Sequence, residues 1–343
     1  MKKLVFKLFG LAIIVMPILT SCNKDDNEIP ETNTIVESLT KGIMDGKLEE
    51  NYTLNAASSY NLTGSFIIES GVTLTIPAGT KILADAAGTE VYIAVLMGGK
   101  ININGSASTP VIMSSANANP GDWGGLTLCG KATTTAGVDA VAEVGGFIYG
   151  GTTDTDNSGS IEYLVIRGTG AQINADSQYN GVSLYAVGSE TKIENIAVID
   201  GADDGVEFFG GTVSVTNIYL KNNEDDAVDW TEGWSGGITN TYISHTVEGF
   251  STAFEGDKVN NNPHFTNVTA ISSVGGTALQ FKAESGATIN NLYLSGYNTN
   301  IDMKDEGPLG NVVIDGYAAI TTDDYNAGTQ VDVSAWTWIN AGL

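Results

Sequence analysis

The sequence predicts an all-β protein that folds as a single-stranded right-handed parallel β-helix with an asparagine ladder. A short phrase with asparagine in its third place, such as Ile-Glu-Asn-Ile from Ile193, recurs at steps of 20 to 27 residues. Such a period with strand-like alternation is typical of a chain coiled into stacked rungs, whereas propeller blades repeat near ~40–45 residues. The asparagines that mark the phrase are Asn195, Asn217, Asn240, Asn267, Asn291 and Asn311.

A second phrase alternates with the first and assigns the faces of the strands. In Gly-Val-Glu-Phe-Phe from Gly205, Val206 and Phe208 point to one side and Glu207 to the other, because side chains alternate along a strand. The apolar side recurs in each coil and is therefore the expected core. The outward position, here called the acidic column, holds Ser183, Glu207, Asp229, Glu255, Gln280 and Asp302.

The asparagines are expected to stack at one corner of the coil. Successive coils lie ~4.8 Å apart, which is the spacing between paired strands. Asparagine tolerates the left-handed dihedrals of a tight corner, and its amide can hydrogen-bond to the same residue in the next coil. The ladder is thus interpreted as scaffold that indexes the rungs.

The two ends of the repeat region show the same pattern less regularly. Alternating segments such as Val72-Thr73-Leu74-Thr75-Ile76 predict earlier coils. Residues 131–160 interrupt the rhythm with threonine and glycine and are expected to form a long loop or flap. The tail after Gly316, with Trp336 and Trp338, is expected to cap the open end, where strand edges would otherwise be exposed.

Residues 1–21 are predicted to be a lipoprotein signal peptide. Lysines open the chain, and the apolar run from Leu8 to Leu19 is too short to span a bilayer. The run ends in Leu19-Thr20-Ser21-Cys22, which resembles a lipobox, so we expect lipidation of Cys22 and anchoring to outer-membrane lipid. Residues 22–50 are expected to be a flexible tether, and residues 51–343 the β-helix domain with its C-terminal cap.

The composition narrows the classes of function. The formal net charge is −25, from 15 Lys and Arg against 40 Asp and Glu, so nucleic-acid binding is not expected, because phosphate contacts need clustered cations. An acidic surface favours divalent cations. The other cysteine, Cys129, has no partner once Cys22 carries lipid, so stability must come from a large apolar core.

Five phrases of the sequence carry a family resemblance. They are Gly64 to Thr80, Gly121-Asp122-Trp123-Gly124-Gly125-Leu126, Asp156-Asn157-Ser158-Gly159, Asp203 to Gly211 and Asp229 to Trp234. Together they resemble a family of β-helix surface lipoproteins that is common in Bacteroidetes and has relatives in other Gram-negative and spirochaete envelopes. The resemblance implies the pectin-lyase-like superfold, an outer-membrane location facing the cell exterior, and no assigned reaction. The acidic residues after Cys22 resemble an export tag of Bacteroidetes lipoproteins.

The acidic column is the first candidate site. Carboxylates stacked at ~4.8 Å repel one another by about 1 kcal/mol a pair when hydrated. Lys282 and Lys304 can relieve the repulsion toward the C-terminal end, but no lysine accompanies Glu207 and Asp229 in their strands. We therefore expect a calcium site at Asp204, Glu207, Asp226 and Asp229, the alternative being a solvated acidic face.

A second candidate for calcium is the segment Asp154-Thr155-Asp156-Asn157-Ser158-Gly159. It matches the first half of a D-x-D-x-S-G calcium loop, with ligands expected from Asp154, Asp156 and Ser158. It lacks the acidic residue at position twelve, where Val165 stands. The alternative is a metal-free loop of Asx turns.

An enzyme is the weaker interpretation of the same column. Glu207 with Asp229 or Glu255 can supply the carboxylate pair of a glycosidase, and Lys282 the cation of a polysaccharide lyase. Stacked coils supply such pairs by accident, however, and an acidic groove repels polyuronates. No zinc-protease or phosphate-loop motif is present in the sequence.

Three classes of function therefore remain open. The first is a non-catalytic surface module that binds glycan or another envelope partner, with Trp234, Tyr185 and Glu255 as contacts, because an exposed aromatic ring can stack on sugar. The alternative for Trp234 is a ring folded over the corner of the coil. The other two classes are a polysaccharide lyase or glycosidase and a structural or adhesive stalk.

Overall fold

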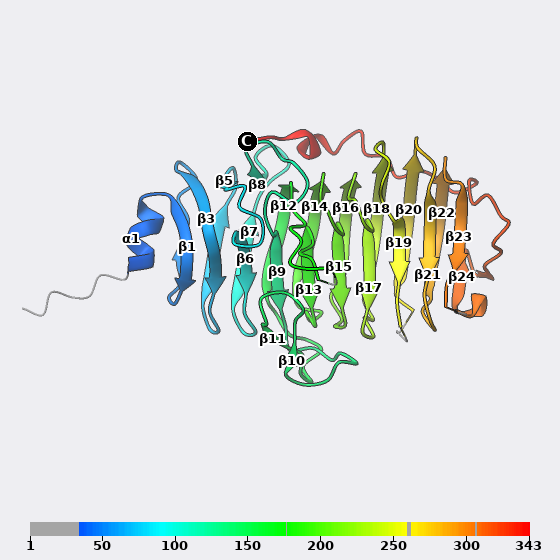
Figure 1. Cartoon of the computed structure of the whole chain (residues 1–343), viewed down its shortest axis with the longest axis horizontal. Helices are drawn as coiled ribbons and strands as arrows, with labels where there is room; N and C mark the ends of the chain where they lie inside the picture. The colour runs from blue at the N-terminus through cyan, green and yellow to red at the C-terminus, as the bar shows by residue number, and fades with distance from the viewer. Residues whose placement is uncertain (1–33, 176, 259–261, 306) are drawn as a thin grey trace, which may run out of the picture. The chain divides into compact units, whose positions relative to one another are not determined.

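The computed structural model describes residues 34–175, 177–258, 262–305 and 307–343, all within one compact unit that runs from Asn33 to Leu343. Its strands pair in parallel from coil to coil, which confirms the predicted parallel β-helix (Figure 1). Each full coil contributes a strand to three ladders, and the apolar side chains of all three point inward to a single core.

The first ladder carries the acidic column. It consists of the second halves of β1 (Ile43–Leu48) and β3 (Ser59–Ile68), then β6 (Tyr92–Val95), β9 (Leu126–Cys129), β13 (Val182–Tyr185), β15 (Val206–Phe209), β17 (Val228–Thr231), β19 (Thr252–Gly256), β21 (Thr277–Phe281) and β23 (Thr299–Met303).

The second and third ladders meet at the asparagine corner, and most of their strands are two halves of one bent segment. The strands are β2 (Tyr52–Thr53), β4 (Thr73–Pro77), β5 (Lys81–Ala84), β7 (Lys100–Asn104), β8 (Val111–Ser115), β12 (Gly159–Arg167), β14 (Lys192–Ile199), β16 (Val215–Lys221), β18 (Gly237–His245), β20 (His264–Ser272), β22 (Ala287–Ser295) and β24 (Val312–Ile314).

Five of the six predicted asparagines form the ladder. Each has φ between 57° and 61°. Each side-chain amide after that of Asn195 donates to the side-chain carbonyl of the asparagine one coil earlier at 2.8–3.0 Å, from Asn217 through to Asn291. The expectation for Asn311 is wrong. It lies in the short 3-10 helix η1 (Leu309–Asn311) and donates to the carbonyl of Glu284. The register of the following strand sets Ile314 beside Ile289, so Asn311 lies before the ladder position of this coil.

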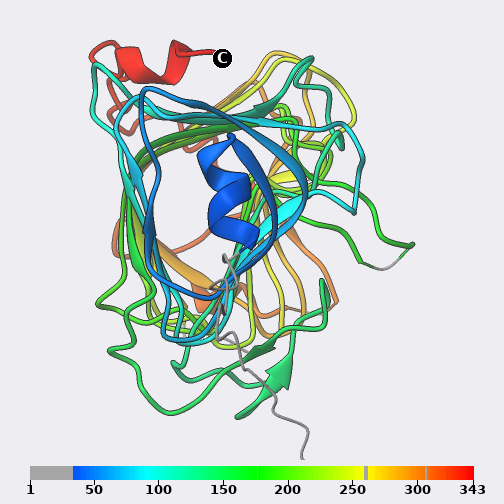
Figure 2. The ribbon, with the colours of Figure 1, turned by 90° about the vertical axis from the view of Figure 1, so that its left-hand side faces the viewer.

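The N-terminal end of the coil is closed by α1 (Thr34–Thr40) (Figure 2). Ile35 and Leu39 of this helix are buried in the main core together with Met44 of β1. The domain therefore begins before residue 51, and residues 34–50 belong to it and not to the expected tether. The signal peptide and Cys22 lie outside the described residues. No helix in the described part of the chain has the length and apolar character needed to cross a membrane.

The C-terminal tail has two parts, of which one was predicted wrongly. Ala319 and Tyr325, which follow the short antiparallel strand β25 (Tyr317–Ala318), pack against the last coil. The tail then runs back along the coils (Figure 1), so that Trp338 of η2 (Thr337–Asn340) packs on β8, β12 and β14 instead of capping the end. Arg167 holds it there by donating to the carbonyls of Ile339 and Ala341 at 3.2 and 3.3 Å.

Candidate functional site

The strand register places the acidic column in the predicted order, one residue on each coil. Glu207 pairs with Asp229, Asp229 with Glu255, and Glu255 with Gln280. Ser183 precedes this series on β13, and Asp302 follows it on β23. The alternation of the second phrase was therefore sufficient to predict which side chains stand next to one another.

The column is buried along most of its length, contrary to the expectation that it is exposed. Glu207 is 9% exposed, Glu255 4% and Ser183 1%. The flap of residues 131–158 contacts this side of the first ladder at Tyr185 and at Glu232. Burial of ionised carboxylates is costly unless hydrogen bonds or a cation compensate, so the partners of each group decide the chemistry of the site.

The flap is the predicted long loop between β9 and β12, and it contains the hairpin β10 (Ala140–Val141) and β11 (Ile148–Tyr149). Tyr149 packs on Tyr185 of β13, and the two rings lie 4.9 Å apart. The carboxylate of Glu232, at the end of β17, accepts from Tyr149 Oη and Thr134 Oγ1, both at 2.8 Å. The flap is thus fixed to the first ladder beside the acidic column.

Two overlapping groups of carboxylates lie in the column. Oxygens of Asp204, Glu207 and Asp229 lie within 4.8 Å of one another, and so do those of Asp226, Asp229 and Glu255. Asp204 and Asp226 come from the loops that precede β15 and β17, three residues before the column position. Because both loops lead into adjacent paired strands, their carboxylates are brought beside Glu207 and Asp229.

The hydrogen bonds of the cluster leave two buried oxygens without partners among the described residues. Asn180 Nδ2 donates to Glu207 Oε2 at 2.7 Å, but Asn180 Oδ1 accepts nothing, although the residue is only 1% exposed. Asp229 Oδ1 is also buried and unpartnered. Buried oxygens that lack donors are unfavourable in isolation and favourable as ligands of a cation.

Burial raises the pKa of Asp204, Glu207, Asp226 and Asp229 well above the ordinary range, and their mutual repulsion adds to it. Without a cation the cluster therefore retains protons where isolated carboxyls would be ionised. The same causes act on a neighbouring group. Burial, with Asp225 nearby, raises the pKa of Asp203 to about 7.

Glu255 differs from its neighbours because it has donors. Burial alone would raise its pKa, but hydrogen bonds from Asp226 and Lys282 outweigh burial and lower the pKa. Lys282 also forms an ion pair with Glu255, and Gln280 donates to it at 3.1 Å. The C-terminal end of the column is thus neutralised by protein groups, whereas the end at Asp204 and Glu207 is not.

The structure brings together all four weak candidates for catalysis, Glu207, Asp229, Glu255 and Lys282. Their chemistry is constrained, because Glu207 accepts from Asn180 and Glu255 is paired with Lys282. Arg167 lies outside this cluster, because its side chain is bound to backbone carbonyls of the C-terminal tail. The arrangement is better suited to holding a cation than to attacking a substrate.

The second calcium candidate lies at the base of the flap. Asp154 Oδ1 accepts from the amide and hydroxyl of Thr133 at 2.9 and 2.8 Å, and Ser158 Oγ donates to Asp156 Oδ2 at 3.3 Å. Asp154 and Asp156 are in none of the carboxylate groups suited to a metal within the described ranges. Calcium binding by this loop stays a prediction.

The expected aromatic contacts for glycan are buried. Trp234 is fully buried, stacks on Phe208 with ring centres 3.9 Å apart, and donates from Nε1 to the carbonyl of Val213 at 3.0 Å. Tyr185 is 1% exposed and stacks on Phe209 beneath the flap. Neither ring, nor Glu255, is available to a ligand at the surface, so the expectation of exposed contacts at these residues is wrong.

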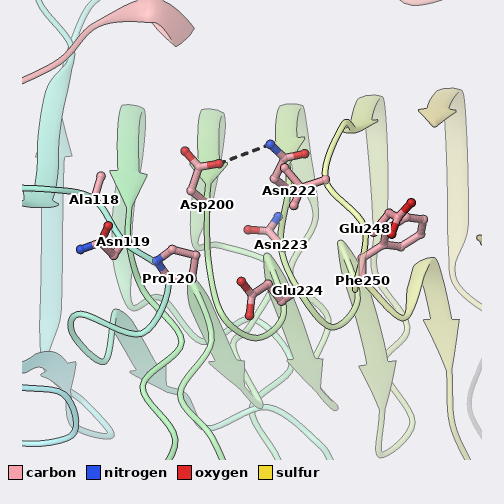
Figure 3. Close-up of a pocket in the computed structure, with 10 residues that line it drawn as sticks. Ala118, Asn119, Pro120, Asp200, Asn222, Asn223, Glu224, Glu248 and Phe250 are labelled. Carbon is pink, nitrogen blue, oxygen red and sulfur yellow. Dashed lines mark hydrogen bonds between the residues drawn. The ribbon is translucent and has the colours of Figure 1, made fainter. Parts of the chain in front are cut away.

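Sequence reasoning missed a pocket of about 270 Å³ beside the third ladder (Figure 3). It is formed by loops that follow β8, β14, β16 and β18, and its lining includes Pro120, Asp200, Asn223, Glu248 and Phe250. These residues share no motif. Their common feature is position, since all of them follow the ends of third-ladder strands, in four different coils.

Comparison with known proteins supports the architecture. The profile of the family described as a pectate-lyase-like beta helix domain matches residues 46–337. No curated protein and no solved structure matches the chain. The matched segment covers most of the described coils, from β1 to the C-terminal tail. The chain therefore belongs to the pectate-lyase-like β-helix domain family.

Proposed function

We propose that this protein is an outer-membrane lipoprotein, facing the cell exterior, whose β-helix binds glycan or another envelope partner without cleaving it and holds calcium in its acidic column. The lipid anchor is proposed on Cys22 and the apolar run before it. The observation that carries the proposal is the cluster of buried Asp204 and Glu207 with half-buried Asp229, none of which forms an ion pair with a lysine or arginine in the described part of the chain.

Calcium fits the donors of this cluster. The ion prefers six to eight oxygen ligands from carboxylates, amide carbonyls and water. Asp204, Glu207 and Asp229 offer carboxylate oxygens within 4.8 Å of one another, and Asn180 Oδ1 is a buried acceptor without a donor. A bound cation would satisfy these oxygens and keep the carboxylates ionised.

Non-catalytic binding is favoured over a lyase or glycosidase by the state of the carboxylates. A catalytic pair must reach the substrate, whereas Glu207 and Glu255 are 9% and 4% exposed and are both engaged in hydrogen bonds. A purely structural stalk is the remaining alternative. It is less favoured because the pocket beside the third ladder offers a place for a ligand.

The test is thermal melting of the purified full-length protein in detergent with calcium, with magnesium and with EDTA. Calcium at 100 times its Kd should add ~2.7 kcal/mol to the free energy of unfolding. Asp204→Asn should remove the gain, and Glu190→Gln, at an exposed position in the turn after β13, should keep it. An unchanged melting temperature with calcium would overturn the calcium site.

The remaining parts of the proposal have separate measurements. Radiolabelled palmitate should be incorporated by the wild-type chain and not by Cys22→Ala. A glycan array should report binding without release of reducing or unsaturated ends. Release of such ends, lost in Glu207→Gln and kept in Glu190→Gln, would instead establish the enzyme.

A further inference from the structure

The pocket in Figure 3 lies along several coils rather than inside one. Each lining residue comes from a loop that follows a strand. Pro120 follows β8, Asp200 follows β14, Asn223 and Glu224 follow β16, and Phe250 follows β18. The ends of these third-ladder strands stand side by side in the sheet. The pocket is therefore elongated in the direction in which the coils stack.

Phe250 gives the pocket a rigid apolar surface. Its ring stacks on the imidazole of His245, with centres 3.6 Å apart and an angle of 2°, and meets Tyr297 edge-on. His245 is buried and its Nδ1 lies 3.0 Å from Tyr297 Oη, so the support is itself fixed. An aromatic ring held in one orientation is a suitable platform for the apolar face of a ligand.

Asn223 gives the pocket an unsatisfied donor and an unsatisfied acceptor. The residue is 1% exposed and lines the pocket, yet neither Nδ2 nor Oδ1 has a partner among the described residues. A hydroxyl group can accept from the amide nitrogen and donate to the amide oxygen, whereas an ammonium group can only donate. The amide thus favours a ligand with hydroxyl groups.

The charge of the lining decides between classes of saccharide. Asp200, Glu224 and Glu248 line the pocket, and no lysine or arginine does so among the described residues. In a chain with net charge −25, these carboxylates repel uronate, sulfate and phosphate groups. Toward an uncharged sugar they act as hydrogen-bond acceptors for hydroxyl groups.

We propose that this pocket binds one sugar unit of an uncharged saccharide, with Phe250 against the face of the ring and Asn223 on its hydroxyl groups. The inference rests on the proposed glycan binding and deepens it by naming the site and the class of glycan. The volume of about 270 Å³ is below the range of ~300–1,000 Å³ that is usual for drug-sized ligands, which suits a single sugar ring.

The experiment uses the full-length protein in detergent on an array of neutral, uronate-containing and amine-containing oligosaccharides, followed by calorimetric titration of the best hit. Neutral oligosaccharides should bind. Phe250→Ala should weaken binding about tenfold or more, and Glu248→Gln, at an exposed position, about threefold. Phe147→Ala, at a half-buried phenylalanine of the flap, is the matched control and should leave the Kd unchanged.

The outcomes separate the two levels of the proposal. Binding of a neutral saccharide that is unaffected by folded Phe250→Ala and by Glu248→Gln would overturn the pocket and leave glycan binding in place. Should Phe250→Ala fail to fold, saccharide binding by Phe250→Leu and by Glu248→Gln tests the pocket in its place. Binding confined to anionic or amine-bearing sugars would overturn the class of ligand, and no binding on the array would overturn both levels.

Discussion

Lys282, in the loop after β21, forms an ion pair with Glu255 on the neighbouring strand β19 and so neutralises the acidic column from its C-terminal end. In the next coil Lys304 lies 3.6 Å from Asp302, which is two residues earlier in the same coil. No lysine or arginine makes such a pair with Glu207 or Asp229 in the described part of the chain. The column is therefore polarised, with lysines at one end and unpaired carboxylates at the other.

Removal of Lys282 should lower the stability of the fold, because Glu255 then lacks its ion-pair partner. Lys282→Met leaves Glu255 buried without its cation, and we expect a loss of about 1–2 kcal/mol in the free energy of unfolding. The loss is smaller than for a fully buried pair, because about a third of the lysine side chain reaches solvent. Urea unfolding in EDTA measures it. Lys192→Met removes a comparable but exposed ion pair with Glu162 and should cost less than ~0.5 kcal/mol.

Asp229→Asn should have opposite effects in the two states of the protein. Without calcium it removes one of several carboxyls whose ionised form is disfavoured by burial and by neighbouring carboxylates, and it should raise stability by about 1 kcal/mol or more. With calcium it removes a ligand, so the gain from the ion should shrink to well under the ~2.7 kcal/mol expected for the wild type. Melting curves in EDTA and in calcium test both statements, and a loss of stability in both conditions would contradict them.

The stability of the calcium-free protein should fall as the pH rises. The pKa values of the buried carboxyls are raised, so the folded state binds more protons than the unfolded state. This difference begins near pH 4, where carboxyls of the unfolded chain ionise, and extends to at least about pH 7, the pKa of Asp203. Stability is thus present in acid and lost toward neutrality. His245, whose pKa burial lowers to about 4, acts in the opposite sense below pH 6.5, but as one group against several.

Urea unfolding in EDTA at pH 5, 6, 7 and 8 measures this dependence. Calcium should reverse it, because ion binding requires ionised ligands and becomes stronger as the pH rises. Asp229→Asn should flatten the slope in EDTA. A stability in EDTA that rises from pH 5 to pH 8 would contradict the protonated cluster.

The asparagine ladder should be sensitive to loss of both the amide and the backbone conformation. Asn240 donates to Asn217, accepts from Asn267 and has φ of 61°. Asn240→Ala should cost about 2–4 kcal/mol, from two hydrogen bonds and a left-handed alanine. Asn240→Gly keeps the conformation accessible and should cost about 1 kcal/mol less. Chemical denaturation measures both, with Asn311→Ala as the control outside the ladder.

Trp234→Ala should destabilise the fold without acting through a ligand. The ring is fully buried on Phe208, and its removal leaves a cavity that should cost about 3–5 kcal/mol. Trp336→Ala, at a half-buried ring of the tail, should cost much less. If Trp234→Ala instead retained full stability and lost glycan binding, the ring would have to be a surface contact after all.

The pattern of the sequence determined much of the fold because it is local and periodic. The two phrases predict which residue pairs with which, and Glu207, Asp229 and Glu255 lie in that order. The period cannot show what covers an outward face. Tyr149 and the rest of the flap come from a segment with no repeat, and they bury Tyr185 from outside. The corner ring of Trp234 likewise has no place in the alternation, so its inward direction was not predictable.

The returning C-terminal tail changes how the coil can come apart. A stack in which each coil touches only its neighbours can fray from either end, one rung at a time. Here Arg167, near the middle of the chain, clasps the carbonyls of Ile339 and Ala341. We therefore expect the clasp to oppose fraying of the last coils one by one and to make unfolding of the C-terminal half more cooperative.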